Sequence, residues 1–571
     1  MDLAPLTRGH RRDTALAPRI LRYDASRNVT TLIRSFAVSA AALAFVTCGD
    51  RPSTSPTGGT IVVGVRAAPE RIHPAFAIST TERLVVDVMY ERLARLGPDL
   101  DPANEAGFVK ELATAWQWST DSSSVTFTLD PAARWHDGQP VRAHDIAFSF
   151  AFVTDPVVGS PLRRELAGVD SVVANDSLTV TAWFNTRSSV RFHDLVVELV
   201  PFPAHVWAAR PREVASTDSL LRRPVGNGRF VFTGSFDPQE LVLVADSTHP
   251  RGRPRVDRLI VRTAPDPATN LARLRTGEVH VLDQLAPDAV LAIAADTTLV
   301  VRSGTAFDYG YLQFNLWVGG TDAPHPFLSD VTVRQALTRG TSRAAIVRAV
   351  YDTFAVVAAG PFVRQQFGAD DAQQAPEDPA AAAAMLEAAG WRRGADGLRE
   401  RDGVPLRLRV LVPTSAAPRI KIAEVLQEQW RAIGVDLQID LLEPATMGER
   451  MRQRDFEAVI ASIRTSVTPT GLRQSWGGAG AQPGGRNAGR YRNAAFDAQV
   501  DSAFATPQAA TARTHFSRAY ATLLADAPAI FLYEASTIVA MDRRITAPPI
   551  RGDAWWFDLA SWGLTDAPAA R

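Results

Sequence analysis

Several features that would define a function are scarce in this sequence. It has one cysteine in 571 residues, Cys48, which excludes an internal disulfide framework and a zinc site built on thiolates. No apolar run beyond residue 47 approaches the roughly 20 residues that a membrane helix needs. Basic and acidic residues number 61 each, and a chain without a basic surplus is a poor candidate for nucleic-acid binding. What remains has 46% hydrophobic and 21% charged residues, an ordinary globular composition with enough chain for two or three domains.

The first 47 residues have the pattern of an export signal. Seven arginines stand among residues 1–34, and an apolar run at residues 35–47 is closed by Cys48. This arrangement resembles a bacterial lipoprotein signal, in which the cysteine is lipidated and becomes the mature N-terminus. A plain secretory signal with an incidental cysteine is the alternative. Without residues 1–47 the net charge falls from zero to about −4, and residues 48–58 are expected to form a flexible tether.

The rest of the chain alternates predicted strands and helices, which indicates an α/β fold. Short apolar runs and period-two alternation predict strands over residues 60–65, 125–129, 178–182, 406–412, 435–441 and 456–463. Apolar positions three and four residues apart predict helices over residues 81–93, 331–339, 342–351, 379–389 and 419–433. Thr81 is the expected N-cap of the first helix. The Gly-rich segment 471–490 lacks a phosphate-loop pattern and is predicted to be a mobile surface loop.

No catalytic constellation stands out. The chain has neither a Gly-x-Ser-x-Gly elbow nor a His-Glu-x-x-His helix, and its ten histidines are scattered. His136 and His144 lie eight residues apart without a third ligand nearby, so we expect structural or surface roles for them. Trp476, Trp555 and Trp556 stand in polar or Gly-rich surroundings, where an indole face often lines a ligand cleft. These observations favour binding over turnover.

A series of short motifs runs through the part of the chain that follows the signal. The most specific is Arg-Trp-His-Asp-Gly-Gln-Pro-Val at residues 134–141 with His-Asp-Ile-Ala-Phe-Ser at residues 144–149. Others are Pro-Val-Gly-Asn-Gly at residues 224–228 and Phe-Leu-Ser-Asp-Val-Thr-Val-Arg-Gln-Ala-Leu at residues 327–337. In this order and spacing they resemble the extracytoplasmic solute-binding proteins of family 5, the dipeptide/oligopeptide-binding components of ABC importers.

The resemblance implies a fold and a division of the chain. The expected fold is α/β, a two-lobed periplasmic-binding-protein clamp of type II with an extra subdomain inserted in the first lobe. Such a clamp holds its ligand between the lobes and closes about a hinge. The implied segments are a signal peptide (1–47), a tether (48–58), the first lobe (59–85, 222–305 and 526–571), the inserted subdomain (86–221) and the second lobe (306–525).

The resemblance leaves the ligand open. Peptide-binding members place an Asp-Pro pair after a strand of the second lobe, where the aspartate takes the ligand's α-ammonium. Here Thr468 and Pro469 occupy that place, and a threonine cannot compensate a buried ammonium. Arg464 favours an anionic group instead, unless it is an ordinary surface arginine. We expect a di- or oligopeptide. The alternatives are an oligosaccharide, an opine, a metal chelate or haem, and in other classes an exported hydrolase or a chaperone.

The family positions also supply candidate contacts and partners. The candidate ligand-binding residues are Ser79, Thr80, Thr81, Arg464, Thr468, Trp476, Tyr491 and Trp555. We expect no catalytic residue, no metal site and no cofactor. The expected partners are a peptide or other small solute, the permease subunits of an ABC importer, and a membrane reached through lipidated Cys48. No nucleic-acid partner is expected, and the protein is expected to be a periplasmic or otherwise extracytoplasmic monomer.

Overall fold

The computed structural model describes residues 58–565, apart from residues 235, 284, 370–372 and 483. Most of its strands belong to one large mixed sheet with the order β18-β17-β19-β12-β20-β11-β1-β10-β9-β8, with β13 paired to β20. The bounds of these strands are β1 (Thr60–Val65), β8 (Phe230–Phe232), β9 (Glu240–Ala245), β10 (Arg258–Thr263), β11 (Val281–Asp283), β12 (Leu299–Phe314), β13 (Ala355–Val357), β17 (Arg407–Pro413), β18 (Asp436–Leu442), β19 (Ala458–Arg464) and β20 (Ala529–Asp542). The sheet therefore contains both parallel and antiparallel pairs, as the α/β prediction requires.

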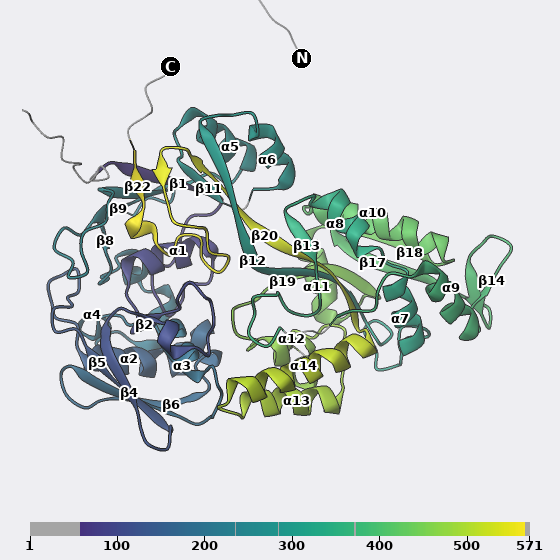
Figure 1. Ribbon diagram of the computed structural model, residues 1–571, viewed down its shortest axis with the longest axis horizontal. Helices are drawn as coiled ribbons and strands as arrows, with labels where there is room; N and C mark the ends of the chain where they lie inside the picture. The colour runs from purple at the N-terminus through teal and green to yellow at the C-terminus, as the bar shows by residue number, and fades with distance from the viewer. Residues whose placement is uncertain (1–57, 235, 284, 370–372, 483, 566–571) are drawn as a thin grey trace, which may run out of the picture. The chain divides into compact units, whose positions relative to one another are not determined.

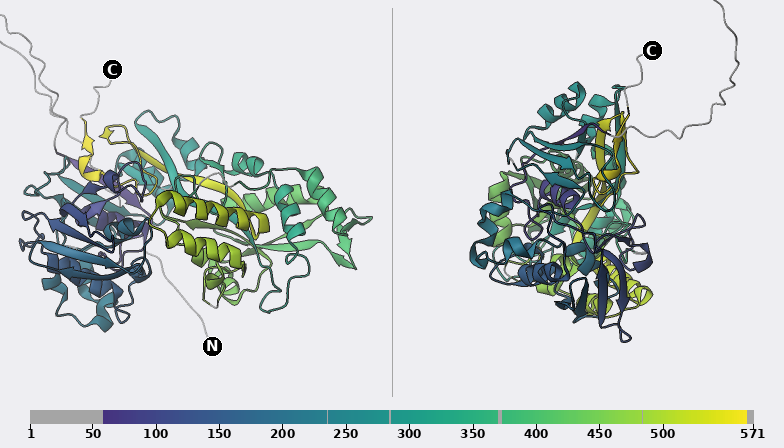
Figure 2. Two further views of the ribbon diagram at one scale, coloured as in Figure 1. Left: turned by 60° about the horizontal axis from the view of Figure 1, so that its bottom comes forward. Right: turned by 90° about the vertical axis from the view of Figure 1, so that its left-hand side faces the viewer.

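Two long strands connect the two lobes. β12 and β20 pair antiparallel from Leu299 opposite Asp542 to Gln313 opposite Ala529, and they run together between the other strands in Figures 1 and 2. Their register shifts between Thr305 and Tyr309, and such an irregularity bends a strand pair. On one side of the shift β20 pairs with β11, and on the other side β12 pairs with β19. The shift therefore marks the point where the sheet passes from the first lobe to the second.

The first lobe surrounds β1, which pairs in parallel with β10 and β11. A separate antiparallel sheet of this lobe has the order β4-β5-β7-β6 and is packed by α2, and α3 lies in the same part of the chain. The bounds in this lobe are α1 (Thr80–Met89), β2 (Ala94–Arg95), β3 (Val109–Lys110), β4 (Ala113–Trp118), β5 (Ser124–Leu129), α2 (Ala143–Thr154), β6 (Val169–Ala174), β7 (Thr179–Phe184), α3 (Arg191–Glu198), α4 (Ala204–Trp207), α5 (Pro267–Thr276), α6 (Pro287–Ile293), β21 (Ile545–Thr546) and β22 (Gly563–Leu564).

The second lobe packs helices on β17, β18 and β19. Its core contains Trp391 and Trp430, both almost fully buried, and the indole N–H of Trp430 donates to the hydroxyl of Thr341 at 2.9 Å. The bounds are α7 (Val331–Arg339), α8 (Arg343–Val350), α9 (Pro379–Ala388), β14 (Arg392–Arg393), β15 (Arg399–Arg401), β16 (Val404–Pro405), α10 (Ala417–Ala432), α11 (Pro444–Gln453), α12 (Leu472–Trp476), α13 (Ala494–Phe504) and α14 (Ala509–Asp526). α13 and α14 pack against each other along their length (Figures 1 and 2).

Most of the predicted elements are confirmed. The predicted strand at 60–65 and the predicted helix at 331–339 match β1 and α7 residue for residue, and the other predicted strands and helices are shifted by a few residues at most, except the first helix. α7 begins where Asp330 accepts a hydrogen bond from the amide of Thr332 at 2.9 Å, which satisfies one of the free N–H groups of the first turn. Local capping and periodicity were sufficient signals for these elements.

Two predictions were wrong. The first helix begins at Thr80 with Ser79 as its N-cap, not at Thr81, and it ends at Met89 instead of residue 93. The segment 471–490 is not a surface loop, because it contains α12 and buries Trp476 and Asn487. Its glycines serve close packing rather than mobility: a Cβ on Gly480 would lie 2.0 Å from the carbonyl oxygen of Gln474.

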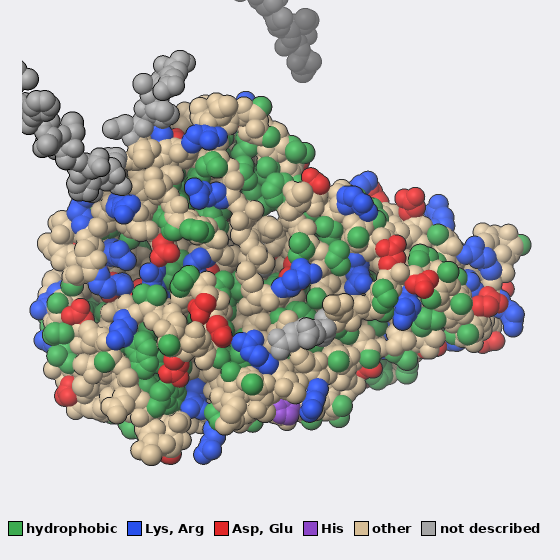
Figure 3. All heavy atoms as spheres, viewed as in Figure 1, with side chains coloured by type: hydrophobic (Ala, Val, Ile, Leu, Met, Phe, Trp, Pro, Cys, Tyr) green, Lys and Arg blue, Asp and Glu red, His purple; other side chains and the backbone are tan. Residues whose placement is uncertain are grey.

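Basic and acidic side chains are interspersed on the face that Figure 3 shows, without a large area of one sign. Among the described residues, no helix has the length and apolar character to cross a bilayer. Cys48, and with it the predicted signal peptide and most of the tether, lies outside the described residues.

Candidate ligand-binding cleft

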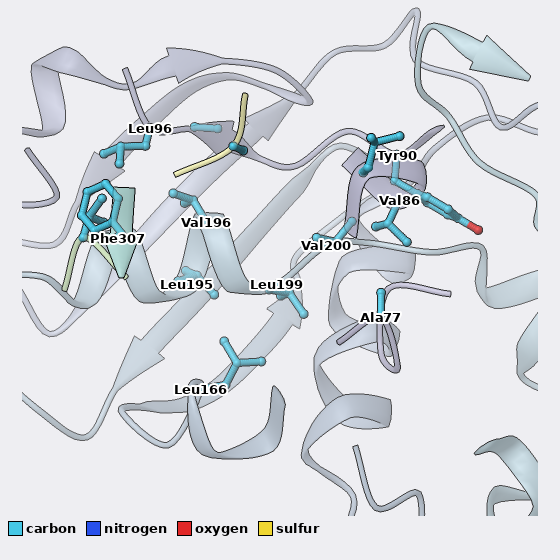
Figure 4. Close-up of a cluster of buried hydrophobic side chains, with 14 of the residues drawn as sticks. Ala77, Val86, Tyr90, Leu96, Leu166, Leu195, Val196, Leu199, Val200 and Phe307 are labelled. Atoms are coloured by element: carbon cyan, nitrogen blue, oxygen red, sulfur yellow. The ribbon is translucent and has the colours of Figure 1, made fainter. Parts of the chain in front are cut away.

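A cavity of about 190 Å³ lies between the two lobes, and we call it the cleft. One wall is formed by α1 and the turn before it, a second by α3, a third by the residues that end and follow β19, and a fourth by residues 553–557. Much of its lining is apolar, including Ala77, Val86, Leu96, Val200, Phe307 and Trp556. Figure 4 shows five of these side chains among the buried hydrophobic residues beside it. The cleft therefore joins apolar surface from both lobes and from the connecting strand β12.

The wall at α1 begins with a capping box. Ser79 accepts a hydrogen bond from the amide of Glu82 at 3.2 Å, and the Glu82 carboxylate accepts from the amide of Ser79 at 3.0 Å. The Glu82 carboxylate also accepts from the amides of Ile78 and Arg71, at 3.1 Å each. This buried carboxylate fixes the turn before α1, and with it the position of Thr80 and Arg83 on the cleft wall.

Arg464 stands at the end of β19, on the opposite wall. It lies directly across from Asp308 of β12, and its guanidinium donates to the backbone carbonyl of Asp553 at 3.3 Å. Burial in the cleft lowers the pKa of Arg464; Asp308, Asp283 and Asp553 oppose that shift, and the nearby charge of Arg83 adds to it. The guanidinium of Arg464 is thus close to several charged groups, although the side chain as a whole remains solvent-exposed.

Asp308 is the carboxylate that faces Arg464. Burial raises its pKa to about 6, while Arg464 and Arg419 pull it downward. Among the described residues it forms no hydrogen bond, so it is a carboxylate poised to take up a proton just below neutral pH.

Other charged side chains of the cleft are paired. Asp87 accepts from the guanidinium of Arg92 at 2.7 Å and from the indole N–H of Trp556 at 2.8 Å. Asp553 accepts two hydrogen bonds from Arg551, at 2.6 and 3.0 Å. Because these charges are neutralised by neighbours, they shape the cleft without offering a free charge to a ligand.

Glu198 is the last residue of α3 and lines the cleft without such a partner. It forms no hydrogen bond or ion pair with any described residue. Burial raises the pKa of Glu165 and of Asp194, and repulsion from Glu198 adds to both shifts. The three carboxylates therefore lie close enough to repel one another.

Of the eight predicted ligand contacts, the structure brings two to the cleft, Thr80 and Arg464. Ser79 is adjacent, with its hydroxyl engaged as the N-cap, and Thr81 is buried behind it. Thr468 is 2% exposed, and its hydroxyl lies 3.2 Å from that of Ser466.

The three predicted aromatic contacts are buried, and each polar group already has a partner. The indole N–H of Trp476 donates to the hydroxyl of Tyr309 at 3.1 Å. The hydroxyl of Tyr491 donates to Asp526 at 2.7 Å. The indole N–H of Trp555 donates at 2.9 Å to the carboxylate of Asp283, and burial raises the pKa of Asp283. The structure buries these three rings in the hydrophobic core, and Trp556 rather than Trp555 lines the cleft.

Sequence reasoning missed Arg83, Glu198 and Asp308. Nothing in a single sequence shows that a charge lacks a partner, because partners come from distant segments. A weak signal existed for two of them: Arg83 stands near the start of a helix and Glu198 at the end of one, positions that disfavour those charges. Among the described residues, no group of three His, Cys, Asp or Glu side chains could hold a metal ion.

The fold and the cleft define a class of protein. Two lobes joined by two long strands around a ligand-sized cleft are the architecture of a periplasmic binding protein, a clamp for a small solute. The chain belongs to the bacterial extracellular solute-binding proteins of family 5, whose middle region matches residues 107–482.

Individual relatives support this assignment. A Pseudomonas aeruginosa protein named di/tripeptide-binding protein 2 is 24% identical over 470 residues, which cover 78% of this chain and 84% of that protein. Heme-binding protein A of Haemophilus influenzae is 25% identical over 488 residues, covering 79% and 82%. The structure of the oligopeptide-binding protein AppA of Bacillus subtilis with a nonapeptide covers 90% of this chain and 100% of that one, with a TM-score of 0.73 and 20% identity. At that identity the structural likeness concerns the fold alone.

Proposed function

We propose that this protein is the substrate-binding component of an ABC importer, and that it captures a short peptide outside the cytoplasmic membrane and delivers it to the permease. One observation carries the proposal. The cleft combines apolar lining from both lobes with charges of both signs, at Arg83, Arg464 and Glu198, which form no ion pair with any described residue. A peptide presents the complementary set: apolar side chains, a carboxylate and an ammonium. The peptide-binding relatives support the same ligand class.

Lobe closure would supply the affinity. When a ligand removes the apolar side chains of the two walls from water, binding becomes more favourable by about 25 cal/mol per Å² of apolar surface buried. Polar contacts strengthen as water leaves, because the local dielectric falls. We place the hinge that this mechanism requires at the register shift between β12 and β20. A non-peptide solute is the alternative, since one relative is named for haem.

Native mass spectrometry of the protein, purified without refolding, tests the ligand class. We expect a co-purified mass that fragments into amino acids, and a rise in melting temperature when di- to pentapeptides are added. If no peptide raises the melting temperature and a sugar, a chelate or haem does, the peptide assignment is wrong. Hydrolysis of the peptide during the assay would instead make the protein an exported hydrolase.

The location and the chain division form a second part of the proposal. We propose that residues 1–47 are an export signal, that Cys48 is lipidated and holds a monomer at the membrane, and that the lobe boundaries are those given above. Labelling with palmitate, followed by membrane fractionation, tests the anchor. The label should enter the wild-type protein and be absent from C48S, which should be released. Equal labelling of both would contradict lipidation.

A further inference from the structure

Resting on the proposed function, we propose that the cleft selects short peptides with two free termini: Arg83 and Arg464 together bind the ligand's carboxylate, and Glu198 binds its ammonium. The family position expected to hold an acid, Thr468, is buried and engaged with Ser466. In this chain the counter-charge for the ammonium would therefore come from the opposite wall of the cleft.

Arg83 is placed where a cation is disfavoured. It occupies the fourth position of α1, close to the positive end of the helix dipole. Its side chain lines the cleft and forms no hydrogen bond or ion pair with any described residue. It also lies close enough to Arg464 for each charge to repel the other. An anion bound between Arg83 and Arg464 would offset both the repulsion between the two guanidinium groups and the unfavourable interaction of Arg83 with the helix dipole.

Arg464 brings the second half of this anion site from the other lobe. It stands at the end of β19, whereas Arg83 belongs to α1 of the first lobe. Its one hydrogen bond within the described residues goes to a backbone carbonyl, which leaves several N–H donors for a ligand. Because the two guanidinium groups come from different lobes, a carboxylate held by both would also hold the lobes together. Recognition and closure would then be one event.

Glu198 is the counterpart for a cation. It is half-buried at the C-terminal end of α3, where the helix dipole disfavours a negative charge. Arg92 is nearby, and although burial opposes its charge, Asp87, Glu111 and Glu198 together keep the pKa of Arg92 above the ordinary value. Its guanidinium, however, donates to Asp87 and to the carbonyl of Val197. The Glu198 carboxylate therefore accepts no hydrogen bond from Arg92, and the ammonium of a ligand would supply the missing donor.

The size of the cleft favours a short ligand. Its volume of about 190 Å³ is below the roughly 300–1,000 Å³ of typical small-molecule pockets. A long peptide would have termini far apart, and both could not reach charges that line this one cavity. The proposal therefore takes dipeptides and tripeptides, whose two ends are close together, as the ligands.

Calorimetric titration with end-blocked peptides tests the proposal. The probes are Leu-Leu and Leu-Leu-Leu, each with free ends, with an N-acetyl group, or with a C-terminal amide. The proteins are the wild type, Arg83→Gln, Arg464→Gln and Glu198→Gln. Arg348→Gln and Glu428→Gln serve as controls, because these residues are exposed on helices away from the cleft.

We expect either block to weaken binding to the wild type by about tenfold to a hundredfold, the value of a charge-assisted hydrogen bond. Glu198→Gln should abolish the effect of acetylation and keep that of amidation, and the two arginine variants should do the reverse. Both controls should behave like the wild type.

Three outcomes would overturn the proposal. The first is that blocked peptides bind as tightly as free ones, and the second is that the variants show the opposite pattern of sensitivity. In either case a peptide still binds, so the proposed function stands while the assignment of termini falls. If no peptide binds and another solute does, the proposed function itself is wrong.

Discussion

Two groups of charged side chains show opposite arrangements. Glu91 belongs to a network of paired charges: its carboxylate accepts from Arg251 and lies 3.0 Å from His249, and Arg251 also contacts Glu111 at 3.2 Å. Around the cleft, Arg83 and Glu198 have no such partners among the described residues, and Arg464 has a backbone carbonyl alone. The same residue types thus occur in a closed network and in an open one.

The difference separates stability from binding. Burial opposes ionisation of Glu91, yet the hydrogen bond from His249 and the charge of Arg251 hold its pKa below the ordinary value, so the network stabilises the ionised form. The cleft charges cost stability in the free protein, through repulsion and unfavourable helix ends. Departures from local rules of this kind are expected where a ligand completes the interactions.

The largest expected effect follows from opening the closed network. Glu91→Gln keeps the shape of the side chain and removes its charge, which leaves Arg251 without its shortest partner. Removing one member of a buried pair costs about 3–5 kcal/mol. We expect a loss of about 3 kcal/mol in the free energy of unfolding, measured in urea, and no change in peptide affinity.

Glu449→Gln is the matched control, because Glu449 pairs with Arg452 on an exposed surface of α11. It should unfold like the wild type. Equal unfolding midpoints for Glu91→Gln and Glu449→Gln would show that the network around Glu91 does not stabilise the fold.

The next effect concerns Asp308, which is intermediate between the two groups. The folded protein raises its pKa to about 6 from an ordinary value of 3.8, because of burial, while Arg464 and Arg419 oppose the shift. Between these pH values the folded state binds the proton more tightly than the unfolded state. Stability therefore falls as pH rises from about 4 to 6, by about 2–3 kcal/mol at most.

Asp308→Asn should remove this loss. We expect the variant to be more stable than the wild type at pH 7.5 and equal to it near pH 4, in urea unfolding curves across that range. Tyr351 and Tyr533 also interact with this position, and burial raises the pKa of each hydroxyl further above this window. A constant difference between the two proteins at all pH values would contradict the account.

The smallest effect is on Arg83 in the absence of ligand. Arg83→Gln should raise the free energy of unfolding by a few tenths of a kcal/mol, because a cation leaves the positive end of α1. Arg348→Gln, in the last turn of α8, should lower it by a similar amount. Paired thermal melts at low salt measure both. Changes of the same sign in the two variants would rule out the dipole as the cause.

The sequence predicted those parts of the fold that depend on neighbouring residues. α7 and β1 follow from a capping aspartate and from an apolar run, both visible in the chain. The Ser-x-x-Glu pattern of Ser79 and Glu82 also marks the start of α1 in the sequence, whereas apolar periodicity alone predicts a start at Thr81. Segment 471–490 was misjudged because its glycines suggested mobility, whereas they allow backbones to approach closely.

The site was less predictable. Family position selected Arg464, which lines the cleft, and also Trp476 and Tyr491, whose polar groups are satisfied in the core by Tyr309 and Asp526. Arg83 and Glu198 became candidates only once the fold showed that the side chain of neither forms an ion pair or a hydrogen bond with a described residue. Pairing across long sequence separations is a three-dimensional property, and it distinguishes a charge held for a ligand from a charge held for the fold.

Thermal unfolding of the wild type and Glu198→Gln, each with and without Leu-Leu, tests the central claim most directly. We predict that without peptide Glu198→Gln melts at the wild-type temperature or above it, because a charge that repels Glu165 and Asp194 has gone. We also predict that Leu-Leu raises the melting temperature of the wild type much more than that of the variant. A variant that melts lower without peptide, and gains as much from Leu-Leu as the wild type, would contradict the central claim.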